Sequence, residues 1–276
     1  MSPQATTGQP VRIALFGATG RMGLSLLRAI HDSTDFELVG ALASPESPAL
    51  GEDAGAVAGL ARRFGVAVTA DRAAALARAE VVLDFTLPGA TLANLEAAAA
   101  AGASLLIGTT ALAAEVLPAV EAAARRIAVL PAPNTSLGVN LLARLVERAA
   151  QALPAEYDIE ILEAHHRYKV DAPSGTALRL GDAAAAGRGS DLKSLAVEHA
   201  SGRPGPRPSG SIGFATLRGG DVAGEHSVFF LGPGERLELT HRAHDRMTFA
   251  YGALRAAEWL RGRPAGRYSM TDVLGL

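Results

Sequence analysis

One stretch decides the fold of this chain: Val11-Arg12-Ile13-Ala14-Leu15-Phe16-Gly17-Ala18-Thr19-Gly20-Arg21-Met22-Gly23. Its first six residues form an apolar run of strand length, and apolar residues at helical spacing follow the glycines. Strand, glycine-rich turn and helix together are the context of a dinucleotide-binding loop. Gly17 permits the tight turn, Gly20 the approach of a pyrophosphate, and Gly23 the close packing of helix on sheet. The alternative is a plain turn between strand and helix that binds nothing.

The pattern continues through the first half of the chain as strands alternating with helices. We expect strands at 36–42, 66–68, 81–85, 105–107 and 127–130, and helices at 72–78, 91–101 and 113–126. Such alternation predicts a parallel sheet with right-handed crossovers. Ligands bind such sheets beyond the carboxyl ends of the strands.

Small and polar residues stand at several of these strand ends. Thr86, Gly108-Thr109-Thr110 and Asn134-Thr135 are therefore expected to line a cofactor cleft, although each could also be an ordinary turn or cap residue. Residues 41–44 contain no acidic residue that could bind the adenosine ribose and no arginine that could bind a 2′-phosphate. The pattern therefore leaves the choice between NAD and NADP open.

After Asn134 the pattern changes to one long helix at 136–153 followed by strands with period-two alternation. These strands are expected at 158–161, 211–216, 226–230 and 236–240. Alternation predicts a sheet covered by helices on one side, with a polar face free for a ligand or another subunit. Residues 201–210 are expected to form an exposed mobile loop. A last helix at 248–261 is expected to return to the first domain.

The domain organisation follows from this change of pattern. We expect a disordered tail at 1–10, and a dinucleotide-binding domain at 11–134 completed by 247–276. A substrate-binding domain is expected at 135–246.

The segment from Glu163 to Thr176, E-A-H-H-R-Y-K-V-D-A-P-S-G-T, gathers proton donors and anion-binding groups. Imidazoles exchange protons near neutral pH, a lysine supplies a compact positive charge, and the N–H groups at a helix start bind carboxylates. The segment therefore predicts a pocket for a small acidic molecule.

Simpler interpretations exist for the same residues. His165 and His166 point to opposite faces if they lie on a strand, so one of them could be structural. Lys169 could be a surface lysine and Ser174 a plain helix cap. A metal site of Glu163 with the two histidines is conceivable, but these ligands are more crowded than usual, so we predict no metal.

Composition narrows the class of protein. The net charge of −2 argues against bulk binding to nucleic acid or anionic membranes, and the absence of cysteine excludes thiolate chemistry. No apolar run approaches a membrane span, and residues 1–10 lack the pattern of a signal peptide. We expect a cytoplasmic protein.

Five segments together resemble the dihydrodipicolinate reductase family. The similarity covers essentially the whole chain after the tail, and the run from Glu163 to Thr176 is its most specific part. The five segments are Gly17–Gly23, Asp84-Phe85-Thr86, Gly108-Thr109-Thr110, Asn134–Asn140 and Glu163–Thr176, and Ser211–Phe214 and Gly224-Glu225-His226 agree further.

The resemblance implies a Rossmann-like parallel sheet domain, an α+β substrate domain with an open mixed sheet, and a homotetramer built through those sheets. It implies reduction of 4-hydroxy-tetrahydrodipicolinate by NADH or NADPH, with loss of water, in lysine and diaminopimelate synthesis. His165 takes the position of the catalytic acid and Lys169 the second catalytic position. Substrate carboxylates would be held by His166, Lys169, Gly175 and Thr176. The cofactor would be held by Gly17, Ala18, Thr19, Gly20, Arg21, Met22, Gly108, Thr109, Thr110, Ala132, Pro133, Asn134 and Thr135.

The residues support this chemistry, and two departures bear on it. A planar dicarboxylate needs anion donors at both ends, and hydride addition to a conjugated imine needs an acid to quench negative charge. Tyr168 replaces a frequent histidine, and Ala43 and Ser44 replace ribose-reading residues, which concerns cofactor preference. Two other hypotheses are a reductase of another small carboxylate and a non-enzymatic NAD(P)H sensor, which would have no use for His165 and Lys169.

Overall fold

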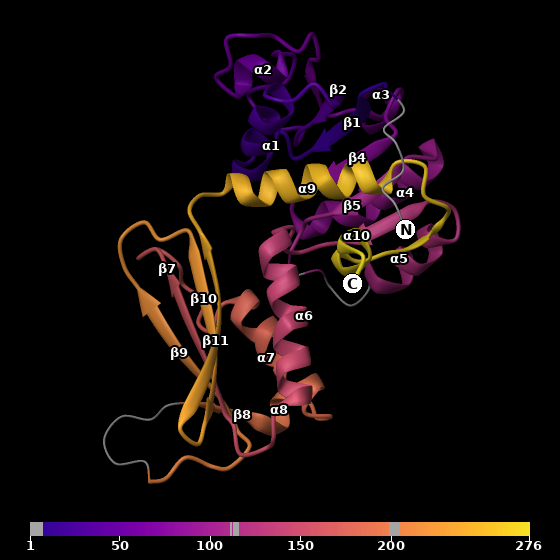
Figure 1. The fold of residues 1–276 in the computed structure, drawn as a ribbon. Coiled ribbons are helices and arrows are strands. Elements are labelled where there is room, and N and C mark those ends of the chain that lie inside the picture. Colours follow the sequence, from indigo (N-terminus) through magenta and orange to yellow (C-terminus); the bar gives the residue numbers. More distant parts are fainter. Residues whose placement is uncertain (1–7, 111, 113–115, 199–204) are drawn as a thin grey trace. The chain divides into compact units, whose positions relative to one another are not determined.

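The computed structural model describes residues 8–110, 112, 116–198 and 205–276. The chain divides into two compact units, Met1–Ser136 with Met247–Gly275, and Leu137–Arg246 (Figure 1). The predicted tail, the helix at 113–126 and the loop at 201–210 lie partly outside the described residues. Among the described residues, no helix is both long and apolar enough to cross a membrane.

The first unit is built on a parallel sheet. Its described strands run in the order β12-β6-β5-β4-β1-β2-β3, and every neighbouring pair is parallel. The strands are β1 (Val11–Phe16), β2 (Phe36–Leu42), β3 (Val68–Thr69), β4 (Val81–Asp84), β5 (Ser104–Ile107), β6 (Ala128–Pro131) and β12 (Gly266–Arg267). The helices are α1 (Arg21–His31), α2 (Ala54–Val57), α3 (Arg72–Leu76), η1 (Pro88–Ala90), α4 (Thr91–Ala101), α5 (Val116–Ala124), α9 (Met247–Leu260) and α10 (Met270–Leu274).

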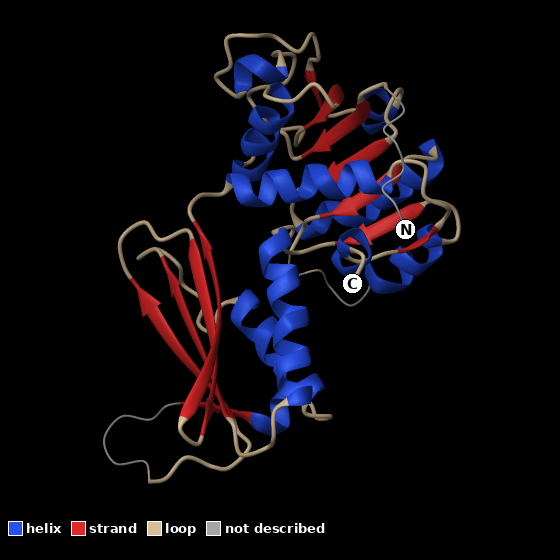
Figure 2. Ribbon diagram, viewed as in Figure 1, coloured by secondary structure: helices blue, strands red, loops and turns tan. Residues whose placement is uncertain are grey.

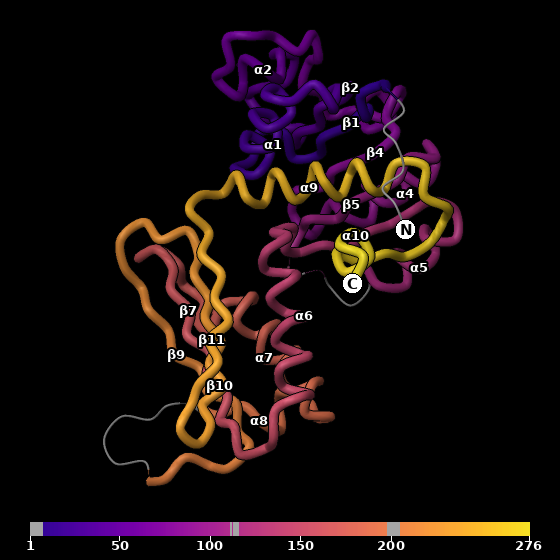
Figure 3. Tube along the Cα trace, viewed as in Figure 1, coloured from indigo at the N-terminus to yellow at the C-terminus, as the bar shows by residue number. Residues whose placement is uncertain are grey.

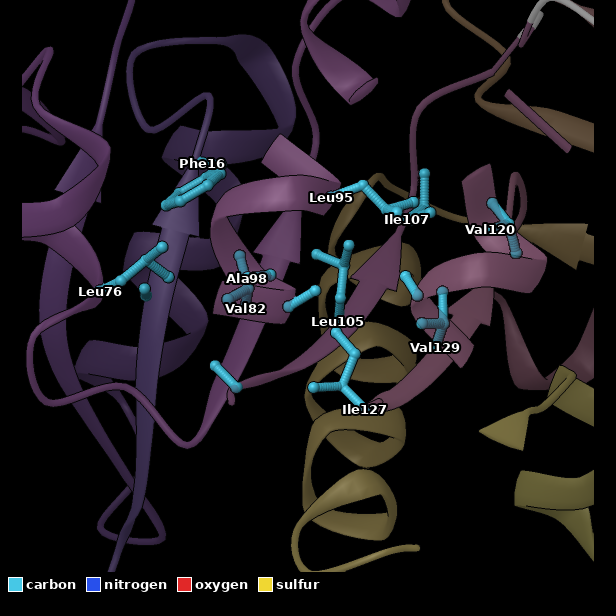
Figure 4. Close-up of a cluster of buried hydrophobic side chains, with 14 of the residues drawn as sticks. Phe16, Leu76, Val82, Leu95, Ala98, Leu105, Ile107, Val120, Ile127 and Val129 are labelled. Carbon is cyan, nitrogen blue, oxygen red and sulfur yellow. The ribbon is translucent and has the colours of Figure 1, made fainter. Parts of the chain in front are cut away.

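Helices cover both faces of this sheet because alternate strand residues point to opposite sides. Phe16, Val82 and Leu105 pack on one face with side chains of α3, α4 and α5, as Figure 4 shows. Ile13 and Leu15, also fully buried, point to the other face. On that face α9, which comes from the C-terminal part of the chain, packs beside α1 and the central strands (Figure 3).

The second unit is a mixed sheet with helices on one face (Figure 2). Its described strands run in the order β11-β10-β7-β9-β8, with β10 antiparallel to both neighbours and β9 parallel to both of its own. The elements are α6 (Leu137–Ala152), β7 (Asp158–His165), α7 (Gly175–Gly187), α8 (Leu192–Leu195), β8 (Ala196–Glu198), β9 (Ile212–Arg218), β10 (Gly224–Gly232) and β11 (Glu235–Ala243). The predicted combination of a parallel sheet domain and a mixed sheet domain is confirmed.

The two faces of the mixed sheet differ from the expectation in one respect. Ile161, Val228 and Phe230 lie on the face that packs with α6 and α7. The opposite face was expected to be polar, yet Leu217 and Leu231 expose 56% and 36% of their surface there. Alternation predicts which residues share a face, but it does not require the outer face to be uniformly polar.

Candidate active site

The glycine loop of the first unit is shaped for close backbone approach. Gly17 has φ +82°, and a Cβ there would lie 2.6 Å from the carbonyl oxygen of Phe85. A Cβ on Gly23 would lie 2.2 Å from the Gly17 carbonyl oxygen. Helix α1 begins right after Gly20, and no described side chain caps it. The first-turn N–H groups of α1 are thus available to an anion, and the cradle fits a dinucleotide pyrophosphate.

The predicted cofactor segments follow strands that are neighbours in the sheet. Residues 17–22 follow β1, residues 108–110 follow β5, and residues 132–135 follow β6, while Thr86 follows β4. Since β6, β5, β4 and β1 are adjacent and parallel, all four segments lie at one carboxyl edge. Thr109 Oγ1 donates to the Thr86 carbonyl oxygen at 3.1 Å, which joins two of these segments directly.

A buried carboxylate supports this edge. Asp84 is fully buried and accepts hydrogen bonds from Thr86 N at 3.0 Å, Thr86 Oγ1 at 2.6 Å and Asn94 Nδ2 at 3.1 Å. Burial raises the pKa of Asp84, although the bonds from Thr86 and Asn94 oppose the rise. The role of Asp84 is to hold the turn after β4.

Some predicted cofactor residues have structural contacts of their own. The Thr135 hydroxyl donates to the carbonyl oxygen of Phe249 in α9 at 2.7 Å, and Asn134 Oδ1 accepts from Ser136 N at 2.9 Å. Arg21 is exposed. Near the end of β2, the Ser44 hydroxyl donates to the carboxylate of Glu46, which lowers the Glu46 pKa. The first acid after β2 is therefore held as a carboxylate.

In the second unit, a buried carboxylate organises the segment that the sequence singled out. Glu163 is 1% exposed and lies on β7 two residues before His165, so both side chains point to the face that α7 covers. Its oxygens accept from His165 Nδ1 at 2.5 Å, from Ser174 N at 3.1 Å, and from Arg218 Nη1 and Nη2 at 2.9 and 2.8 Å. We call Glu163, His165, Ser174, Thr216, Arg218 and His226 the carboxylate cluster.

The charge state of His165 follows from these contacts. Burial raises the Glu163 pKa by itself, but the bonds from Arg218 and His165 outweigh it, and the net pKa is lowered. An ionised Glu163 can only accept, so neutral His165 carries its proton on Nδ1, and Nε2 is its unprotonated nitrogen. Burial holds the pKa of His165 below its ordinary value, although Glu163 opposes the shift. The free imidazole is therefore mostly neutral at pH 7.

His226 completes the cluster from β10. It lies opposite Glu163 in the strand register, and its ring stands edge-on to that of His165 at 5.1 Å. His226 Nε2 and the Ser174 hydroxyl are 3.0 Å apart, and that hydroxyl accepts from Ala177 N at the start of α7. Burial lowers the pKa of His226 to about 4, and His165 adds to the shift. His226 is a neutral packing partner of the site.

The predicted substrate residues lie in the segment that follows β7 and at the start of α7. Gly175 and Thr176 begin α7, and Lys169 forms an ion pair with Asp171 at 2.8 Å. The backbone carbonyl of Asp171 accepts from Arg218 Nη2 at 2.6 Å, which ties the lysine loop to the cluster. The buried Nδ1 of His166 makes no hydrogen bond with any described residue. A buried ring nitrogen without a partner fits a site that expects a polar ligand.

The carboxylate cluster also contains side chains that could in principle bind a metal ion. Among the described residues, Glu163, His165 and His226 bring potential ligand atoms within 4.8 Å of one another. The sequence had suggested His166 as the third member instead. The Glu163 oxygens already accept from the Arg218 guanidinium, the Ser174 N–H and His165, so the carboxylate is used as a hydrogen-bond acceptor.

Sequence reasoning missed the roles of four of these residues. Glu163 was considered only as a metal ligand, although its i, i+2 spacing from His165 on a strand was a usable signal. Arg218 and Thr216 could not be found, because the register of β9 against β7 places them there. His226 was noted as part of a matching segment, without a role.

The comparisons with known proteins agree over both units. The family models "Dihydrodipicolinate reductase, N-terminus" and "Dihydrodipicolinate reductase, C-terminus" match residues 11–135 and 138–274. A 4-hydroxy-tetrahydrodipicolinate reductase of Alkalilimnicola ehrlichii is 54% identical over 96% of this chain and 99% of its own length. One of Rhodopseudomonas palustris strain HaA2 is 53% identical over 96% of this chain and 98% of its own.

A solved structure has the same fold. The "Dipicolinate bound Dihydrodipicolinate reductase from Paenisporosarcina sp. TG-14" superposes with a TM-score of 0.76 at 22% identity, and covers 95% of this chain and 98% of its own. The resemblance found in the sequence is confirmed. With both family models matched along nearly the whole chain, this protein belongs to the dihydrodipicolinate reductase family.

Proposed function

We propose that this chain reduces 4-hydroxy-tetrahydrodipicolinate to tetrahydrodipicolinate, with loss of water, in lysine and diaminopimelate synthesis. The observation that carries the proposal is an imidazole held by a buried carboxylate, beside a lysine and the start of a helix. Relatives named for this activity, more than 50% identical along the chain, support it.

The cofactor is NADH or NADPH, and the first unit provides its site. Residues 17–22, 108–110 and 132–135 would hold it, with the pyrophosphate at the glycine loop and the start of α1. When bound, the dinucleotide would supply the hydride for the reduction.

The substrate carboxylates are held by groups of the second unit. Lys169 supplies a positive charge, and Gly175 and Thr176 offer N–H groups at the start of α7. The buried Nδ1 of His166, which has no hydrogen-bond partner among the described residues, is a further polar group for the ligand. A dianionic ligand thereby meets donors from two separate parts of the unit.

His165 supplies the proton. Its Nδ1–H is committed to Glu163, so the proton transferred to the substrate is carried on Nε2. Burial keeps the pKa of the free imidazole low, and a bound dianion raises it by stabilising the imidazolium. His165 is then charged when the acid is needed.

The assembly and location of the enzyme are further parts of this proposal. A homotetramer built through the mixed sheets and a cytoplasmic location, without nucleic-acid or membrane partners, follow from the family resemblance and from the net charge of −2. The exposed Leu217 and Leu231 on the outer face of the mixed sheet are consistent with burial in such an assembly.

The test is steady-state oxidation of NADH and NADPH with substrate made freshly from pyruvate and aspartate semialdehyde by the upstream synthase. Oxidation that depends on the synthase supports the proposal. Dinucleotide binding without turnover would instead favour a sensor, and turnover with a different small carboxylate would favour another reductase.

A further inference from the structure

The carboxylate cluster joins three strands and a helix start at a single side chain. Glu163 on β7 is paired in register with Thr216 on β9 and with His226 on β10. His165, at the end of β7, is paired in register with Arg218. These strand residues point to the face that α7 covers, and five hydrogen bonds from four residues reach the Glu163 carboxylate, which is 1% exposed.

The two oxygens of Glu163 have different partners. Oε2 accepts from His165 Nδ1 at 2.5 Å and Arg218 Nη1 at 2.9 Å. Oε1 accepts from Ser174 N at 3.1 Å, Arg218 Nη2 at 2.8 Å and Thr216 Oγ1 at 3.3 Å. The paired bonds from Arg218 fix the plane of the carboxylate, which in turn fixes where each oxygen points. One oxygen holds the imidazole, and the other holds the residue that caps α7.

We propose that Glu163, clamped by Arg218, is the positioning residue of this site: it sets the tautomer of His165 and at the same time anchors the start of α7. The inference rests on the proposed function for its catalytic meaning, although its structural part does not need that function. Arg218 extends the same control to the lysine loop through its bond to the Asp171 carbonyl oxygen. Glu163 and Arg218 thus fix the positions of the proton donor and the carboxylate-binding groups relative to one another.

The charge of Glu163 is essential to this role. A glutamine at this position would keep the shape but present an N–H₂ group to donors, and one of its bonds to Arg218, Ser174 or His165 would be lost. His165 would then favour a proton on Nε2 with Nδ1 as acceptor, and its imidazolium would lose a buried counter-charge. The groups around His165 that carry or can carry charge are Glu163 on β7, Arg218 on β9, His226 on β10, and Lys169 and Asp171 in the following loop.

The first measurement is the imidazole ¹⁵N NMR spectrum of the full-length protein, which needs no turnover. We expect neutral His165 to carry its proton on Nδ1 in the wild type and on Nε2 in Glu163→Gln. A wild-type His165 protonated on Nε2 would overturn the proposal, even if the variant failed to fold.

The second measurement is the pH dependence of kcat and KM. Activity of an acid catalyst falls as pH rises through its pKa in the complex, so loss of the Glu163 charge should move this fall about one unit lower. We expect kcat of Glu163→Gln to drop about 10²-fold while the dissociation constant of NADH, bound in the other unit, stays unchanged. Arg218→Lys keeps a positive charge, so it should keep the Nδ1–H tautomer and lose less activity.

Glu160→Gln is the matched control. It is the same chemical change on the same strand, but Glu160 points to the opposite face and pairs with Arg207 at 3.1 Å. This variant should retain the wild-type pH profile. If Glu163→Gln shared that profile and the wild-type tautomer, Glu163 would have no positioning role. If the wild type had no reductase activity but showed the expected tautomers, the proposed function would fail and the structural inference would stand.

Discussion

At the residue scale, the site depends on where protons and charges are held. His165 and Lys169 come from the same short segment, but their surroundings differ. His165 is largely buried against Glu163, whereas Lys169 reaches a surface carboxylate, Asp171, whose side chain is 57% exposed. A group committed to a buried partner is suited to proton transfer, and a group with an exchangeable surface partner is suited to binding an incoming anion.

Replacement of these two residues should therefore have different effects. His165→Ala should lower kcat by about 10²–10⁴-fold with little change in KM, because under the proposed function it removes only the proton donor. Lys169→Ala should raise KM as well as lower kcat. Steady-state kinetics, with NADH affinity measured separately by fluorescence, checks both. Near-full turnover in both variants would show that the site is assigned wrongly.

The end of β2 predicts the cofactor preference. Glu46 is held ionised by Ser44, and residues 41–50 contain no lysine or arginine to receive a 2′-phosphate. We expect kcat/KM to be higher for NADH than for NADPH. Glu46→Ala should narrow the difference, and Glu121→Ala, which removes another exposed carboxylate, on α5, is the control. A preference for NADPH in the wild type would contradict this prediction.

At the element scale, the start of α1 packs closely against the glycine turn that follows β1. In Gly23→Ala the new methyl group would meet the backbone oxygens of Gly17 and Ala18, at 2.2 and 2.6 Å, and backbone cannot move as a side chain can. We expect the free energy of unfolding to fall by about 2 kcal/mol and NADH to bind more weakly. Gly89→Ala, where a Cβ meets nothing within 4 Å, should leave both quantities nearly unchanged. Denaturant titration and NADH fluorescence measure them.

At the scale of the whole molecule, each unit has its own core, and the second unit holds a buried imidazole in its neutral form. His226 has a pKa of about 4 in the fold against 6.5 when free. Between these two values the unfolded chain binds more protons than the folded chain. The contribution of the neutral His226 to the free energy of unfolding is therefore fully present above pH 6.5, and it is lost as the pH drops toward 4.

Between pH 6.5 and pH 4 the free energy of unfolding should fall by about 3 kcal/mol because of His226. His226→Gln should flatten this part of the pH dependence, and denaturation followed by circular dichroism at pH 7.5 and pH 5 would detect the change. His31→Gln, which replaces an imidazole of the first unit, is the control and should keep the wild-type slope. An equal slope in the wild type and in His226→Gln would contradict the prediction.

Much of this organisation was predictable from local sequence. The strand at Val11–Phe16 and the helix at Thr91–Ala101 have the expected bounds, and the predicted parallel sheet is present. Short elements such as α2 and β12 were not expected, because two to four residues carry too little periodic signal. The strand expected at 66–68 lies instead at Val68–Thr69, an edge strand with little apolar pattern.

The sequence by itself determined the alternation of strands and helices, the glycine loop and the run from Glu163 to Thr176, since these depend on local propensity and spacing. Only the tertiary structure decided which distant residues complete the site. Arg218 lies 55 positions beyond Glu163 and reaches it through strand register. Register depends on how whole strands bury their apolar faces, and no local pattern contains that information.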